Sequence, residues 1–205
     1  MPKIAQRKEE IHQPYWATVI RGTPGAFQPI AAMQATTTLF VSTATGNLAI
    51  TNMDGSSAFS SDSIYRILAM RVFLYFRGCA GTASYGGAIS DHMMYHRAMS
   101  QLYWELKVAS KVEFQAMTSY LPAGGGLYGD VGSDTTVFFV NGMPSQESIC
   151  KLARSISLPA RQGFQVVCNS IALGAANLVT DINALTAGEI HISYALDGLI
   201  LRDVL

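Results

Sequence analysis

The sequence predicts an all-β fold, a β-sandwich or jelly roll of eight to ten strands with one or two short helices in its loops. Hydrophobic residues repeat with a period of two in several segments, and Gly, Pro, Asn and Asp residues that form turns separate these segments. The regular strand–helix alternation of a parallel sheet is absent. At 205 residues the chain has the length of one domain with a large core.

The first 14 residues are polar and mixed in charge and end at Pro14, which predicts an N-terminal arm ahead of a jelly-roll domain at residues 15–205. Lys3, Arg7 and Lys8 form a small basic cluster in this arm, which makes them candidates for contacts with anionic lipid or nucleic acid. Two glutamates follow at positions 9 and 10 and largely cancel the local charge. A solvated arm is therefore the interpretation we favour, with its contacts mainly between subunits.

Strands are predicted at residues 15–20, 27–33 and 36–42, with turns after them at 21–25, 46–47 and 54–55. The clearest strand covers residues 67–77. One of its faces is purely apolar and predicts contact with a core: Leu68, Met70, Val72, Leu74 and Phe76. The other face is aromatic and basic and is a candidate for a second covered surface: Ala69, Arg71, Phe73, Tyr75 and Arg77.

A helix is predicted from Ser90 or Asp91, either of which can cap it, to about Gln101. Strands follow at residues 102–109, 112–116, 135–140 and 164–168, while residues 172–179 fit a strand or a helix. The 102–109 segment places alternate residues inward: Leu102, Trp104, Leu106 and Val108. The last strand, residues 189–204, has a continuous apolar face: Ile190, Ile192, Tyr194 and Leu196. Gly198 then predicts a bulge or a close backbone approach.

Composition points to association with other protein surfaces. Only 14% of the residues are charged, against a norm of about 25%, and the formal net charge is zero. The three cysteines have no CxxC spacing and are predicted to be buried free thiols, which favours a reducing compartment. We expect no signal peptide and no membrane span, since the longest apolar run is about half the roughly twenty residues that a spanning helix needs.

A histidine pair is the strongest candidate for metal chemistry. His92 and His96 lie four residues apart and so share one face of the predicted helix, which is half of a zinc site. The metalloprotease motif needs Glu after the first His, but this position is Met93, and no third ligand is near in sequence, although His191 or Asp91 could approach in the fold. We therefore expect no bound metal and no cofactor, and interpret the pair as a surface feature.

Other catalytic patterns have little support. The glycines at 124–126 lack the Lys-Ser/Thr and the helix start that a phosphate loop needs. No Gly-x-Ser-x-Gly motif occurs, and Cys79 has no neighbouring base in the sequence. The sequence therefore predicts a protein that is not an enzyme.

A series of short phrases, in order along residues 50–205, resembles jelly-roll capsid and structural proteins of tailless bacteriophages. The phrases are Leu158-Pro-x-Arg-Gln-x-Phe164, Leu196-Asp-Gly-x-x-x-Arg-Asp-Val204, and the segments 51–55, 102–108, 111–117, 121–126 and 141–145. The chain is too short for the roughly sixteen strands of a double jelly roll, which leaves a single one.

The resemblance implies a structural subunit of an icosahedral phage capsid, either a capsomer or a vertex protein, that folds in the host cytoplasm and ends in the virion. The partners it implies are further copies of the chain and other capsid proteins, with an internal membrane or the genome as candidates for the arm, and no small-molecule substrate. Two alternatives stay open: a carbohydrate- or ligand-binding β-sandwich module, and a cupin-like metal-dependent enzyme.

Overall fold

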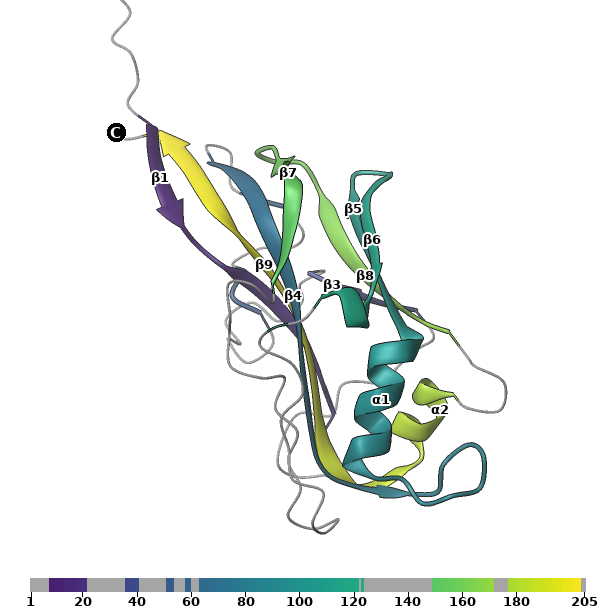
Figure 1. Cartoon of the computed structure of the whole chain (residues 1–205). Helices are drawn as coiled ribbons and strands as arrows, with labels where there is room; N and C mark the ends of the chain where they lie inside the picture. The colour runs from purple at the N-terminus through teal and green to yellow at the C-terminus, as the bar shows by residue number, and fades with distance from the viewer. Residues whose placement is uncertain are drawn as a thin grey trace, which may run out of the picture.

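The fold is an antiparallel β-sandwich, as Figure 1 shows for the computed structural model. The structure describes residues 8–21, 36–40, 51–53, 58–59, 63–121, 123, 149–171 and 177–203. The all-β prediction is confirmed for this part of the chain. The strands predicted at 27–33 and 135–140 and the glycines at 124–126 lie outside the described residues.

Two sheets make up the sandwich. Sheet A contains β1 (Lys8–His12), β2 (Tyr15–Arg21), β9 (Leu185–Asp203), β4 (Ser63–Gly81) and β7 (Cys150–Leu158). Sheet B has the order β3 (Thr36–Leu39), β8 (Phe164–Ser170), β5 (Leu102–Val108) and β6 (Lys111–Met117). The core lies between them, and the rings of Tyr194 on β9 and Trp104 on β5 meet there with centroids 5.1 Å apart.

The strand order is that of a single jelly roll, as predicted. β1 and β2 pair end to end along the same edge of β9, so together they act as the first of the eight strands in the described part of the chain. This combined first strand pairs with the last strand, β9. In the same way β3 pairs with β8, β4 with β7, and β5 with β6. These are the pairs of one long hairpin. Two further pairs, β4 with β9 and β5 with β8, form when that hairpin is rolled into two sheets.

The two 19-residue strands β4 and β9 form the centre of sheet A. Ile190, Ile192, Tyr194 and Leu196 are all buried, as the alternation predicts. Full burial of a side chain of this size contributes about 1.5–3 kcal/mol relative to exposure, so this face is a main source of stability.

One residue of β4 departs from the predicted pattern. Leu68 is 40% exposed, although Met70, Val72, Leu74 and Phe76 are buried as expected. The cause is a bulge: Ile67 pairs with Gly198 and Ala69 with Asp197, so Leu68 has no partner and the inward phase changes at this point. Gly198 permits the close approach, because an added Cβ would lie 2.9 Å from the carbonyl carbon of Arg66.

Two helices lie at one end of the sandwich. α1 (Asp91–Gln101) begins where Ser90 caps it by accepting a bond from the Met93 N–H, as predicted. α2 (Leu178–Asn183) is capped by Asn177, so the ambiguous segment is helical where it is described, from Leu178 onward. The buried Arg97 of α1 forms an ion pair with the buried Asp181 of α2, which joins the two helices. The 3₁₀ helix η1 (Thr118–Tyr120) follows β6.

The prediction that residues 1–14 form an arm is wrong for the part that is described. Residues 8–12 are β1, a strand of sheet A that pairs with β9 of the same chain. Glu9 forms an ion pair of 2.9 Å with Arg202, and the Gln13 N–H donates to the Gly198 carbonyl at 3.1 Å. The alternation of β1 is masked in the sequence because an edge strand with exposed side chains tolerates charge on either face.

Candidate functional site

The outer face of sheet A is the surface on which β2, β9 and β4 place the side chains that do not enter the core. Register fixes which of them are neighbours, because residues opposite each other on antiparallel strands project from the same face. Ala195 of β9 lies between Trp16 of β2 and Arg71 of β4. Ser193 lies between Thr18 and Phe73 in the next row.

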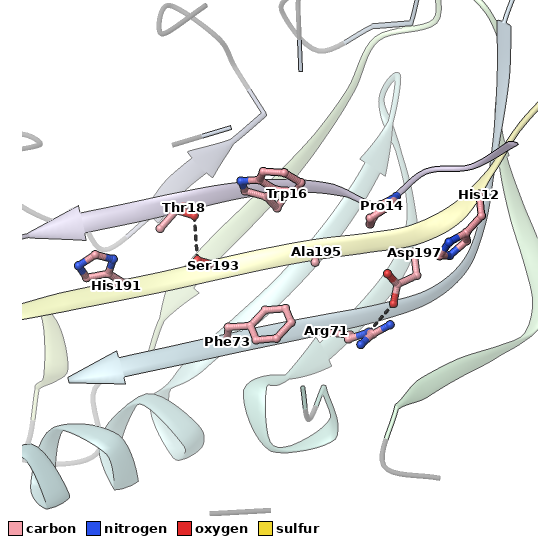
Figure 2. A pocket seen from close by; sticks show the side chains of 10 residues that line it. All are labelled: His12, Pro14, Trp16, Thr18, Arg71, Phe73, His191, Ser193, Ala195 and Asp197. Atoms are coloured by element: carbon pink, nitrogen blue, oxygen red, sulfur yellow. Dashed lines mark hydrogen bonds and ion pairs between the residues drawn. The ribbon is translucent and has the colours of Figure 1, made fainter. Parts of the chain in front are cut away.

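A groove follows from this arrangement (Figure 2). The two central side chains, Ser193 and Ala195, are small, whereas Trp16 and Phe73 on the flanking strands are large. The result is a hollow with a volume of about 540 Å³. His12, Pro14, Thr18, Arg71, His191 and Asp197 complete its lining.

Polar contacts organise the floor and one end of the groove. The Thr18 and Ser193 hydroxyls share a hydrogen bond of 2.8 Å across the strands. Arg71 Nε donates to Asp197 Oδ2 in an ion pair whose side chains are 20% and 12% exposed. The groove therefore combines aromatic walls with hydroxyls and one charge pair that is neutral overall.

His191 lies at the other end of the groove and is half-buried. Its ring meets the Tyr75 ring edge-on, with centroids 5.3 Å apart. Burial lowers the pKa of His191 below its ordinary value of 6.5, and this effect outweighs the opposing influence of Glu189. The imidazole is thus neutral at neutral pH and offers one donor and one acceptor.

A second zone of the same face is apolar. Ile64 and Leu68 of β4 are 38% and 40% exposed, and the half-buried Leu199 and Leu201 of β9 lie near them, since Ile64 pairs with Leu201 and Arg66, between Ile64 and Leu68, pairs with Leu199. We call these four residues the apolar patch. Of the aromatic and basic face predicted for β4, Arg71 and Phe73 line the groove, Tyr75 contacts His191 at its end, and Ala69 is buried.

The predicted histidine pair is present but stays apart from other candidate ligands. His92 and His96 are exposed on α1 with ring centroids 4.3 Å apart. Asp91 is buried and accepts the N–H groups of Gly78 and Cys79 at 2.9 and 2.7 Å. His191 projects from the outer face of sheet A, whereas α1 packs on its inner face through Tyr95 and Phe76.

No group of three or more His, Cys, Asp and Glu residues that could hold a metal is found among the described residues. The absence of a bound metal remains a prediction. Elemental analysis of the purified chain tests it, and close to one zinc per chain that is lost in His92→Ala would contradict it.

The cysteines and the basic cluster complete the sequence candidates. Cys79 is buried, and burial followed by the charge of Asp91 raises the pKa of its thiol, which suppresses the reactive thiolate. All three cysteines are free, as predicted, but only Cys79 and Cys168 are buried, whereas Cys150 is partly exposed. Lys3 and Arg7 lie outside the described residues, and Lys8 begins β1.

Sequence reasoning missed the groove. The signals were present in part: an aromatic and basic face on β4, and a tryptophan in the strand predicted at residues 15–20. However, Trp16 and Ala195 are brought together by the register of two strands far apart in the chain, which alternation within one strand does not give.

A scan against protein-family models and a search of curated proteins each find no match to this chain. Among the described residues, no helix is both long and apolar enough to cross a membrane.

Proposed function

We propose that this protein is a self-assembling structural protein, a jelly-roll subunit of an icosahedral phage capsid that acts in the virion. The observation that carries the proposal is the strand order, in which the strands that the structure describes form one long hairpin rolled into two sheets. This is an architecture of viral capsid proteins, and also of lectins and cupins. The phrase series in the sequence favours the capsid among these.

The apolar patch supports assembly of copies of the chain. Ile64, Leu68, Leu199 and Leu201 lie at one end of sheet A, around Arg66, and burial of their apolar side chains against a second copy is favourable. The zero net charge of the chain adds no long-range repulsion between copies. The patch is thus the surface that we expect to be buried in the first contact between subunits.

Light scattering of the purified chain, followed by negative-stain imaging, tests the proposal. We expect a defined oligomer, and Leu68→Glu should shift it towards monomer because a charge would be buried in the contact. Val112→Glu is the matched control, since Val112 on β6 of sheet B is 37% exposed and the change in charge is the same. A monodisperse monomer of the unmodified chain at tens of micromolar would refute self-assembly.

The groove supports a second candidate function, that of a ligand-binding β-sandwich module. The specific observation is a hollow with two aromatic side chains and an internally neutral charge pair on the same face of sheet A. Ligand binding and assembly can coexist, because the residues of the apolar patch do not line the groove.

A further inference from the structure

We propose that the groove on the outer face of sheet A binds a neutral saccharide of one or two rings. Its volume of about 540 Å³ lies within the range of about 300–1,000 Å³ typical of small-molecule sites. It lies on three hydrogen-bonded strands, so its walls are positioned by the sheet. This assignment is independent of self-assembly.

The aromatic walls fit the apolar faces of a sugar ring. Trp16 and Phe73 come from β2 and β4, on the two sides of β9, and Figure 2 shows Ala195 and Ser193 on the strand between them. A pyranose exposes C–H groups on its faces and hydroxyls at its edge. Its faces can therefore pack against these rings while its edge reaches the polar groups.

The charge pair selects against a ligand with net charge. Arg71 contacts Asp197 through Nε and Oδ2. The terminal nitrogens of the guanidinium and the second carboxylate oxygen take no part in that contact. A hydroxyl both donates and accepts, so vicinal hydroxyls can bond to both side chains without separating them. A phosphate would instead face the Asp197 carboxylate, and an ammonium group would face the Arg71 guanidinium.

The remaining polar groups have the same character. The floor offers the hydroxyls of Thr18 and Ser193, and the neutral His191 can donate and accept at one end. His12 lies at the other end, beside Asp197 (Figure 2). The polar part of the lining thus matches a ligand that is rich in hydroxyls.

Tryptophan fluorescence of the full chain provides the test. The chain has two tryptophans, and Trp104 is fully buried between the sheets, so a change in emission on adding a ligand reports mainly on Trp16. The probes are glucose, galactose, mannose, N-acetylglucosamine, lactose and cellobiose, with glucose 6-phosphate and a short single-stranded oligonucleotide as charged comparators. Saturation-transfer difference NMR gives an independent readout. At least one neutral sugar should give a saturable change in both.

Three variants locate the site. Ala195→Leu fills the groove and should abolish binding, and Phe73→Ala should weaken it at least about tenfold, which corresponds to about 1.4 kcal/mol. Tyr120→Ala is the control, since Tyr120 is 71% exposed on η1, outside the groove, and its loss should leave binding unchanged. Thermal unfolding checks that each variant is folded. If Ala195→Leu does not fold, Phe73→Ala still tests the site, because its position is exposed.

The assignment is overturned if no neutral sugar saturates at tens of millimolar, or if the charged comparators bind and the neutral sugars do not. The assignment is also overturned if the Phe73→Ala variant binds the sugar as tightly as the Tyr120→Ala variant. These results do not depend on whether the chain is a monomer or an oligomer, so a failure here is distinct from a failure of self-assembly.

Discussion

Tyr65 of β4 contacts both β9 and the segment between β1 and β2 through one hydroxyl, and its replacement by phenylalanine tests whether this contact stabilises the fold. The side chain is fully buried, and its O–H lies 2.9 Å from the Gln13 carbonyl and 2.7 Å from the Leu196 carbonyl. Gln13 lies between β1 and β2, so the hydroxyl of this β4 residue ties their connection, as well as β9, to β4.

The expected loss follows from the number of bonds. A phenol has one proton, so the two carbonyls share it, and Tyr65→Phe leaves about one buried acceptor without a donor. Such a loss costs about 1–3 kcal/mol. For a chain of this length, about 2–4 °C per kcal/mol gives a fall in Tm of about 2–12 °C. Thermal and urea unfolding at a fixed protein concentration measure it.

Tyr194→Phe is the matched control. Tyr194 is also fully buried, but its hydroxyl donates at 2.9 Å to Met70 Sδ, and a thioether is a weak acceptor. The loss in free energy of unfolding should be below about 1 kcal/mol. If Tyr194→Phe costs as much as Tyr65→Phe, the reasoning from acceptor strength is refuted.

Three further predictions follow from the same sheets. Gly198→Ala should destabilise the fold by more than Gly86→Ala, because the new Cβ at position 198 would collide with the Arg66 carbonyl. Gly86 has φ +90° and open space around it, so an alanine there meets only a backbone penalty of about 1–2 kcal/mol. Equal losses in the free energy of unfolding, measured with urea, would contradict this prediction. Burial raises the pKa of Cys168 in the folded state above its ordinary value of 9.0, so the folded state keeps a proton that the unfolded state releases, and stability should fall as the pH rises through 9.0. In Cys168→Val this part of the fall should be absent from the pH dependence of the urea midpoint. Deletion of residues 196–205 should abolish cooperative unfolding, since this part of β9 pairs with both β1 and β4, and a truncated chain that still unfolds cooperatively would show that these residues are dispensable.

Alternation predicted the interior of the sandwich well because burial on one face imposes a period of two on the sequence. The inward residues of β5, from Leu102 to Val108, and those of β9 up to Leu196 are all buried. Ser90 identified the start of α1 for a local reason, since a cap depends on residues only three positions apart.

The predictions that failed depend on partners distant in the sequence. Leu68 is exposed because of a bulge opposite Gly198, and the pattern within β4 does not reveal on which strand the extra residue lies. Val112 of β6, which continues the inward alternation in the sequence, is exposed because a register shift places it opposite Lys107, whereas Phe114 pairs with the buried Leu106. The groove likewise needs the relative register of β2, β9 and β4, which follows from the assembled sheet.

The place of β9 in the chain has a consequence during synthesis. β9 is the last strand in the described sequence, yet it is the hydrogen-bonding partner of β1, β2 and β4. At about 5–20 residues per second, a ribosome needs on the order of ten seconds or more to reach β9 after it has made β2. From the time each is made, first β2 and then β4 lacks this partner. We therefore infer that the nascent chain depends on chaperones to avoid aggregation until residues 185–203 emerge.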